Sequence, residues 1–280
     1  MHEWLADDVQ VNGVTLHYYR TGGDKPPVML AHGFSDNGLC WTPVAEVLEA
    51  DYDVIMPDAR GHGRSARIPP APSEEVGWEM LADDLAGLIA ALGLDRPALL
   101  GHSMGAATAA LVAARHPEHT RAILLEDPPW QDAPPNKPSD EDEKPEEPKH
   151  TIPPWWRDLP NKTRAELIAE CQEEHPAWSM AEIEPWAESK RQFDPHIFKI
   201  PAGPRPAWRT YVAKITCPTL LITADPDQGA LVTAEVAHAA QRLLPDLRIE
   251  HIAGAGHSIR REQFEPYIAA VTTFLKEVMK

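Results

Sequence analysis

The stretch Gly101-His102-Ser103-Met104-Gly105 decides the fold, because it stands between two segments of different structural preference. The run before it, residues 97–100, is apolar and short enough for a buried strand. Residues 106–115, which follow it, are small and helix-forming. A Gly-x-Ser-x-Gly motif between a strand and a helix is typical of a nucleophile elbow, a tight turn in which Gly101 and Gly105 supply the room that the serine needs. The sequence therefore predicts that Ser103 is an exposed nucleophile above a helix N-terminus.

Composition and charge limit the class of protein. The chain has 280 residues, of which 43% are hydrophobic, and this length and composition allow one large core with an inserted subdomain. Its formal net charge is −17. We expect no binding to nucleic acid or to anionic membranes, because both need a basic protein surface. The acidic first residues lack the apolar core of a signal peptide, and no run approaches a membrane span. Three widely spaced cysteines are typical of reduced thiols, so we expect a cytoplasmic protein.

Buried strands alternate with helices along most of the chain. A hairpin is expected over residues 9–19, around Asn12-Gly13. The alternation that follows predicts an α/β fold with a mostly parallel, doubly wound sheet and reactive groups at the carboxyl ends of its strands. The expected strands after the hairpin are 28–31, 54–57, 97–100, 122–125, 218–223 and 247–252, and the expected helices are 41–49, 73–92, 106–115, 233–244 and 261–278.

The alternation breaks between Trp130 and about Trp208, where prolines, tryptophans and charges replace the strands. We predict that residues 129–208 form a helical cap over a core made of residues 1–128 and 209–280.

Within the cap, helices are expected over residues 163–174 and 179–192, the second opened by a capping box of Ser179 and Glu182. The Pro-rich acidic tract 132–150 has too little apolar content to order itself and is expected to be mobile.

A serine hydroxyl is a weak nucleophile, so Ser103 needs a base and an oxyanion hole. His257 lies between Gly256 and Ser258 in a loop after the last predicted strand, where a neutral imidazole could accept the serine proton. The backbone N–H after the nucleophile belongs to Met104, and the loop after strand 28–31 offers a second N–H at Phe34. We expect the side chains of Phe34 and Met104 to line the acyl pocket.

Four motifs stand along the chain, namely His32-Gly33-Phe34, Asp58-x-Arg60-Gly61-x-Gly63-x-Ser65, Gly101-x-Ser103-x-Gly105 and Gly256-His257. Together they resemble the α/β-hydrolase fold family, and the resemblance covers nearly the whole chain outside the cap. The branch that it resembles includes esterases, lactonases, carbon–carbon bond hydrolases and cofactor-free perhydrolases. Epoxide hydrolases and haloalkane dehalogenases share the scaffold but carry aspartate at the elbow, so Ser103 argues against both activities.

Two carboxylates compete as the group that orients His257. A reading without gaps puts Asp227 at the usual position of the family, in the loop after strand 218–223. That loop, however, resembles family members in which it is remodelled and a glutamate at the position of Glu126 serves instead. We expect Glu126, with Asp227 as the alternative. Asp225 and Asp127 each precede a proline and are expected to cap turns.

The sequence thus predicts a serine hydrolase that cleaves a carboxylic ester or lactone through an acyl-enzyme. The alternatives are a carbon–carbon bond hydrolase or perhydrolase with the same triad, and a non-catalytic binding protein on this scaffold. Trp130 and Trp186 of the cap are candidate contacts to a small-molecule substrate with an apolar group. No metal-ligand spacing or dinucleotide fingerprint is present, so no cofactor is expected.

Overall fold

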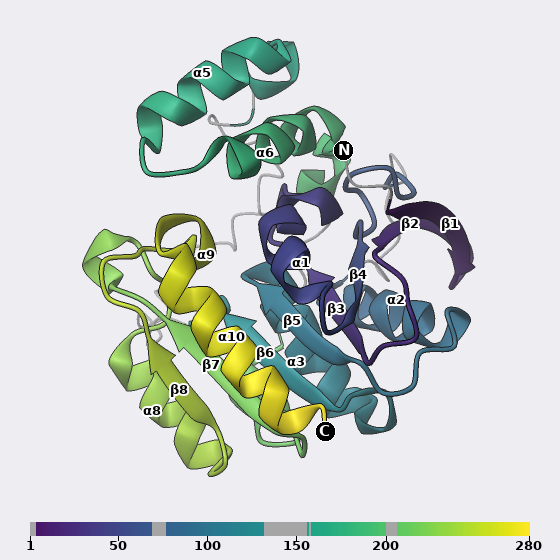
Figure 1. Ribbon diagram of the computed structural model, residues 1–280, viewed down its shortest axis with the longest axis vertical. Coiled ribbons are helices and arrows are strands. Elements are labelled where there is room, and N and C mark those ends of the chain that lie inside the picture. Colours follow the sequence, from purple (N-terminus) through teal and green to yellow (C-terminus); the bar gives the residue numbers. More distant parts are fainter. Residues whose placement is uncertain (1–3, 69–76, 132–155, 157, 200–205) are drawn as a thin grey trace, which may run out of the picture.

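An eight-stranded sheet runs through the core in the strand order β1-β2-β4-β3-β5-β6-β7-β8 (Figure 1). The computed structural model describes residues 4–68, 77–131, 156, 158–199 and 206–280. The pairs from β4 to β8 are parallel, and only β1–β2 and β2–β4 are antiparallel among the described strands. The predicted α/β class with a mostly parallel sheet is confirmed. The strands are β1 Leu5–Val11, β2 Val14–Arg20, β3 Pro27–Ala31, β4 Asp53–Pro57, β5 Ala98–His102, β6 Ala122–Glu126, β7 Thr219–Thr223 and β8 Arg248–His251.

The predicted hairpin is formed by β1 and β2. Asn12 and Gly13 both have positive φ, 48° and 79°, as the two central residues of a type I′ turn require. This turn matches the twist of the strands and fixes their register, in which Val11 faces Val14.

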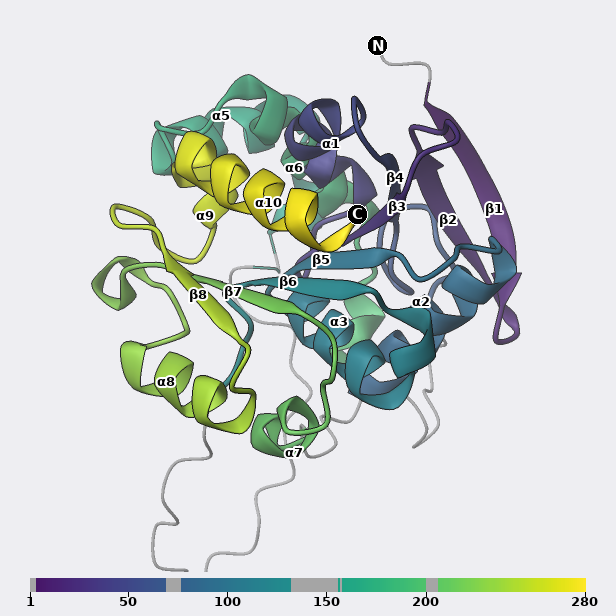
Figure 2. The same ribbon diagram turned by 60° about the horizontal axis from the view of Figure 1, so that its bottom comes forward.

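Helices cover both faces of the sheet (Figure 2). On one face, α1, α9 and α10 pack on strand residues such as Leu30 and Leu100. On the other, α2, α3, α7 and α8 pack on their strand neighbours, such as Met29 and Leu99. Successive strand residues thus belong to opposite layers of one doubly wound core. The helices are α1 Thr42–Leu48, α2 Trp78–Ala91, α3 Met104–Arg115, α7 Trp208–Val212, α8 Ala234–Leu243, α9 Ile259–Glu262 and α10 Phe264–Val278.

Two predicted helix boundaries need comment. The single closing helix that the sequence predicts over 261–278 is two helices, α9 and α10, because Gln263 leaves the helical region at φ −137° and ψ 65°. The predicted start of α2 near Ser73 lies outside the described residues, which resume at Gly77.

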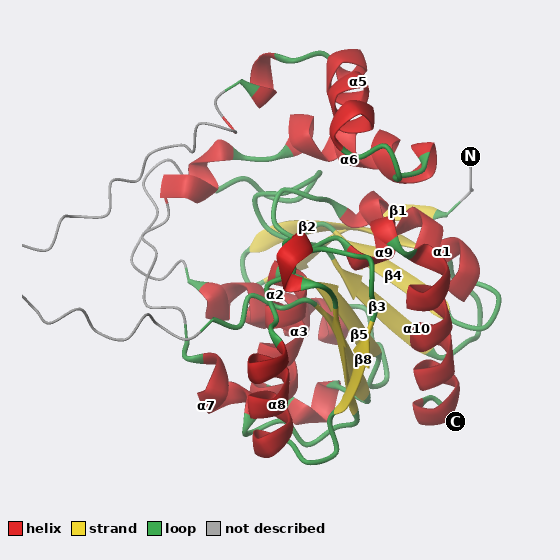
Figure 3. Ribbon diagram, turned by 90° about the vertical axis from the view of Figure 1, so that its left-hand side faces the viewer, coloured by secondary structure: helices red, strands yellow, loops and turns green. Residues whose placement is uncertain are grey.

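The described part of the predicted cap is helical. Helices α5 (Arg164–Glu174) and α6 (Met180–Gln192) lie above the end of the sheet where the parallel strands finish (Figure 3). They enclose an apolar cluster of their own, which includes Trp156, Leu167 and Phe193. No strand occurs in residues 156, 158–199 or 206–208, as predicted. The tract 132–150 lies outside the described residues, and the division into core and cap stays a prediction.

The predicted capping box is at the wrong helix. Thr163 and Glu166 form it at the start of α5, where the Thr163 hydroxyl accepts from the Glu166 N–H and the Glu166 carboxylate accepts from the Thr163 N–H. Ser179 is the N-cap of α6, but its side chain makes no capping bond. The other half of the predicted box is absent for a tertiary reason, because the Glu182 carboxylate accepts a hydrogen bond from Arg261 at 3.2 Å instead.

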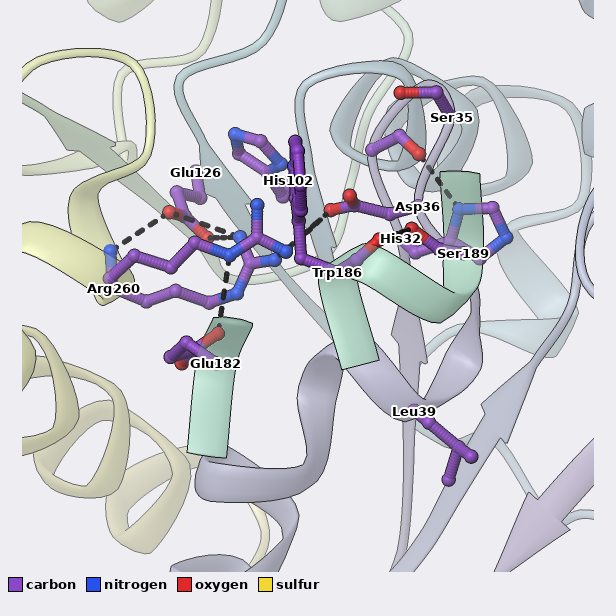
Figure 4. A network of polar contacts seen from close by, with 12 residues as sticks. His32, Ser35, Asp36, Leu39, His102, Glu126, Glu182, Trp186, Ser189 and Arg260 are labelled. Carbon is purple, nitrogen blue, oxygen red and sulfur yellow. Dashed lines mark hydrogen bonds and ion pairs between the residues drawn. The ribbon is translucent and has the colours of Figure 1, made fainter. Parts of the chain in front are cut away.

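Six buried charged side chains join α6 to the core, and we call them the ionic cluster (Figure 4). Asp36, in the loop after β3, lies 3.1 Å from Lys190 of α6 and 2.9 Å from Arg261 of α9. Each of the six is exposed by 6% or less. The cluster contains three carboxylates and three cations, so its formal charges cancel. Its members are Asp36, Glu126, Glu182, Lys190, Arg260 and Arg261.

Asp36 is the residue on which this cluster converges. Burial acts to raise the pKa of its carboxyl group, but Arg261, Lys190 and Arg260 together hold that pKa well below its usual range. A carboxylate whose pKa is depressed on folding stabilises the folded state above its unfolded pKa. That stabilisation is lost as the pH falls through the folded pKa.

We predict that Asp36→Asn lowers the free energy of unfolding at pH 7 by about 3–5 kcal/mol, because it leaves the buried ammonium group of Lys190 without a carboxylate partner and removes one of the two carboxylates that pair with Arg261. The difference from wild type should shrink as the pH falls below about 4, where the unfolded carboxyl group takes up a proton. Urea denaturation at pH 7 and pH 3.5 measures both effects. Glu277→Gln is the control, since it breaks the half-exposed Arg248–Glu277 pair and should cost less than about 1 kcal/mol. Equal losses for the two variants would contradict the prediction.

Candidate active site

Ser103 occupies a strained turn between β5 and α3. Its backbone has φ 51° and ψ −112°, a conformation that non-glycine residues rarely adopt. Its N–H donates to the Glu126 carbonyl of the neighbouring strand β6 at 2.9 Å, which holds the turn in place. The residue is only half-buried, whereas its neighbours on both sides are buried. The geometry is that of the predicted elbow.

The two glycines of the motif are required by close backbone approach. A Cβ atom at Gly105 would lie 2.0 Å from the Ala31 carbonyl oxygen of β3. A Cβ atom at Gly101 would lie 2.3 Å from the Gly105 carbonyl oxygen. Any side chain at either position would push α3 away from the sheet and open the turn at Ser103.

His257 lies in the loop between β8 and α9, as predicted, and a carboxylate holds its ring. Its Nδ1 is 2.6 Å from Oδ2 of Asp127, whose side chain is fully buried. The Asp127 carboxylate also accepts hydrogen bonds from two backbone N–H groups. The Leu231 nitrogen lies 2.8 Å from Oδ2, and the Val232 nitrogen lies 2.8 Å from Oδ1. Because the Asp127 carboxylate can only accept hydrogen bonds, Nδ1 of His257 must carry the proton. Nε2 of His257 is therefore left as the basic nitrogen.

The strand register explains why Ser103 and Asp127 lie together. His102 at the end of β5 is paired with Glu126 at the end of β6, and each candidate residue comes directly after its strand. Asp127 also has a positive φ of 41°, so the chain turns sharply at both positions. Two neighbouring parallel strands thus deliver a serine and a carboxylate to the same edge of the sheet.

The expectation that Glu126 orients His257 is corrected by these contacts. Glu126 is the last residue of β6, and its carboxylate accepts from the guanidinium of Arg260 at 3.2 Å and from the Arg260 backbone N–H at 3.1 Å. Successive strand residues point to opposite faces, so a shift of one residue decides between the two carboxylates. Glu126 belongs to the ionic cluster and Asp127 to His257.

Asp227, the alternative, lies in the short turn η5 (Pro226–Gln228) and is exposed. No hydrogen bond joins it to His257 or to another described residue. The neighbouring Asp225 takes part in a local network with His251 and the Gly254 N–H. The ungapped alignment is therefore also wrong for this chain.

The loop after β3 carries Phe34 to the elbow. A Cβ atom at Gly33 would lie 2.5 Å from Nδ1 of His102, so only glycine lets the loop pass this close. Within the described chain the Phe34 N–H donates to no acceptor, and the next residue, Ser35, has a positive φ of 63°. Met104 is the first residue of α3, so its N–H belongs to the unpaired helix N-terminus. The Met104 N–H directly follows Ser103 in the chain, and the role of the Phe34 and Met104 N–H groups as oxyanion donors stays a prediction.

The side chains of Phe34 and Met104 face different surroundings. The Phe34 ring is 38% exposed and makes edge contacts with Phe193 and Phe198 of the predicted cap, at centroid distances of 5.1 and 5.5 Å. Met104 is buried and lines an apolar cavity of about 40 Å³ together with Leu85. Phe34 thus contacts aromatic side chains of the predicted cap, whereas Met104 faces a cavity that residues of α2 help to line.

Three further histidines near the elbow are fully buried. Burial lowers the pKa values of His32, His62 and His102, and for His62 and His102 the value falls well below 6.5. All three are therefore neutral at pH 7, and His257 is the one described histidine beside the elbow that is partly exposed.

The two candidate tryptophans differ in position. Trp130 is 1% exposed, its ring stacks on that of Trp208 with centroids 5.3 Å apart, and its N–H donates to the Tyr211 hydroxyl. It is a core residue, so the prediction of a substrate contact is wrong. Trp186 is only partly buried, and its ring centroid lies 5.1 Å from the ammonium nitrogen of Lys190. Its contact with a substrate stays a prediction.

Sequence reasoning missed Asp127 and the ionic cluster. Asp127 follows the strand next to the elbow strand, and that position at the sheet edge was the signal that could have identified it. Among the described residues, no three metal-ligating side chains lie close enough to hold an ion. None of the described helices is long and apolar enough to cross a membrane.

Comparison with known proteins identifies the family of this chain. Residues 26–260 match the family described as alpha/beta hydrolase fold. An N-formylmaleamate deformylase of Pseudomonas putida is 29% identical over 96% of this chain and 95% of its own length.

Solved structures agree in fold. The structure of an E-2-(acetamidomethylene)succinate hydrolase covers 98% of this chain and 100% of its own at a TM-score of 0.77 and 23% identity. The enol-lactonase of Burkholderia xenovorans covers 96% of this chain and 100% of its own at a TM-score of 0.71 and 22% identity. The family match covers most of the chain and includes the strands that carry Ser103 and Asp127. The protein is therefore a member of the α/β-hydrolase family.

Proposed function

We propose that this protein is a serine hydrolase that cleaves a carboxylic ester or lactone through an acyl-enzyme. Ser103 is the nucleophile, His257 the base and Asp127 the group that orients the base. The observation that carries the proposal is the 2.6 Å hydrogen bond between His257 and the buried Asp127, beside the strained turn of Ser103. A binding protein on the same scaffold would need neither feature.

In the first half of the reaction, the Ser103 hydroxyl oxygen attacks the substrate carbonyl carbon while its proton passes to Nε2 of His257. The resulting oxyanion accepts hydrogen bonds from the N–H groups of Phe34 and Met104. As the tetrahedral intermediate collapses, the bond to the leaving oxygen breaks and His257 returns the proton to it. Asp127 stabilises the imidazolium that exists between these steps.

In the second half, a water molecule attacks the acyl-enzyme and gives a proton to His257. Collapse of this second intermediate releases the carboxylic acid, and the proton returns from His257 to Ser103. Neither half requires a metal or a redox cofactor, because the proton moves only between these groups.

The surroundings of the elbow support a small-molecule substrate with an apolar group. Phe34, Phe193 and Phe198 supply aromatic surface there. The cations of the nearby ionic cluster are each paired with a carboxylate, so they offer no uncompensated charge to an anionic substrate. The acidic composition and the reduced cysteines support a cytoplasmic enzyme.

Amide hydrolysis is the second candidate. It is favoured by the full-length similarity to a protein named N-formylmaleamate deformylase, and the same triad can transfer an acyl group from nitrogen. The carbon–carbon bond hydrolase alternative uses the same residues. A panel of p-nitrophenyl esters of increasing chain length, their matched anilides and a vinylogous diketone separates the three. Ester turnover with no anilide turnover supports the first candidate, turnover of the anilides supports the second, and turnover of the vinylogous diketone supports the carbon–carbon bond hydrolase.

We predict that Ser103→Ala lowers kcat on the best substrate by about 10⁴-fold or more, because loss of the triad serine removes the covalent route. The melting temperature should stay close to that of wild type, since one half-buried hydroxyl is lost. Labelling with a fluorophosphonate, followed by peptide mapping, should place the adduct on Ser103. Residual activity above a tenth of wild type would show that the chemistry occurs elsewhere.

We predict that Asp127→Asn lowers kcat by about 10²–10⁴-fold, because an amide cannot hold the imidazole in the required tautomer. Asp227→Asn is the matched control. The same substitution on the exposed η5 turn should leave kcat within about twofold of wild type, as expected for a surface change. Steady-state kinetics on an activated ester compare the two variants. If Asp227→Asn is the impaired variant, the assignment of Asp127 is wrong.

A further inference from the structure

We propose that His102, the residue before the nucleophile, positions the base His257 through a hydrogen bond to its main chain. This inference rests on the proposed function and adds a positioning residue to it. Nε2 of His102 is 2.9 Å from the carbonyl oxygen of His257. The two rings also contact each other, with centroids 4.8 Å apart and planes inclined at 44°. One turn of the chain would thereby carry the nucleophile and hold the base.

The contact fixes the tautomer of His102. A carbonyl oxygen can only accept, so Nε2 must carry the proton. Nδ1 is then an acceptor, and it has no partner among the described residues. Protonation of Nδ1 would place a charge in a fully buried site close to Arg260, which is why the pKa of His102 lies well below 6.5. His102 therefore remains a neutral donor throughout the pH range in which His257 works.

His102 is rigidly placed to act on the loop of His257. It is the last residue of β5, paired with Glu126 on β6 (Figure 4). Its ring is only 4% exposed and is packed against the backbone of Gly33. A donor on a central strand is held more rigidly than a donor on a loop, so it fixes the position of the acceptor carbonyl more accurately.

Other contacts hold the loop only on either side of His257. The Ala255 carbonyl accepts from the Asp225 N–H at 2.9 Å, and the Arg260 N–H donates to Glu126 at 3.1 Å. Within the described residues, the bond to His102 is the hydrogen bond made by the main chain of His257 itself. Asp127 sets the direction of the ring, and His102 sets the position of the backbone from which the ring extends. A displacement of about 1 Å at a catalytic group can cost about 10²-fold in rate.

The test compares His102→Gln with His102→Met. Both side chains place their terminal atom as many bonds from the backbone as Nε2 of histidine, but only glutamine has a donor there. We expect His102→Met to lower kcat per active site by about 10–100-fold with KM little changed, because the base is displaced rather than the substrate. His102→Gln should restore kcat to within about threefold of wild type. Active sites are counted by fluorophosphonate titration, so that misfolded protein does not enter kcat.

His17 provides the control pair. It is also a buried histidine, 2% exposed, but lies on β2 and contacts Asp8 instead of the elbow. His17→Gln and His17→Met should change the melting temperature without changing kcat per active site. A loss of kcat in His102→Gln as large as that in His102→Met would overturn the inference, as would a His102→Met variant within threefold of wild type.

A second measurement covers the case in which His102→Met does not fold. Nitrogen-15 NMR of the wild-type protein should show His102 as the neutral Nε2–H tautomer from pH 5 to pH 9. A ring that titrates in this range, or that carries its proton on Nδ1, would overturn the inference. Failure of the proposed catalytic triad looks different, because the wild-type Ser103 would then not react with the fluorophosphonate at all.

Discussion

The strained turn at Ser103 is the constraint on which the rest of the site depends. A non-glycine residue at φ 51° and ψ −112° costs on the order of 1–3 kcal/mol, so the surrounding structure must enforce it. Helix α3 does so by lying so close to β3 that Gly105 has no room for a side chain. Nearly all of α3 is buried, and this packing offsets the strain. The same approach aims the helix N-terminus at the place where an oxyanion would form.

The ionic cluster is the second organising element, and it connects the site to the predicted cap. Lys190 and Glu182 come from α6, whereas Arg261 comes from α9, which directly follows the loop of His257. Burying six charges is costly, and their mutual pairing must repay that cost through accurate geometry. We infer that the cluster serves specificity of assembly more than stability, since its ion pairs join α6 and α9 to β6 and to the loop after β3.

Much of the fold was predictable because its patterns are local. Apolar runs gave the buried strands, Asn12-Gly13 gave the hairpin, and the Gly-x-Ser-x-Gly context gave the turn at Ser103. The acid was assigned wrongly because two carboxylates, Glu126 and Asp127, are adjacent and have similar chemistry. Which of them faces His257 depends on where β6 ends and on the turn at Asp127, whose φ is 41°. Its position before Pro128 resembled that of an ordinary turn cap.

The sequence by itself determined the fold class, the place of the elbow and the loop that carries His257, because periodicity and glycine spacing act over a few residues. Only the tertiary structure decided the partner of His257, the pairing of Glu182 with Arg261 in place of a capping box, the burial of Trp130 and the pairing of the ionic cluster. Each of these depends on residues far apart in the chain: Asp127 and His257 are separated by 130 positions. Such contacts form only when the strand register and helix packing of the whole molecule are fixed, and no local pattern records them.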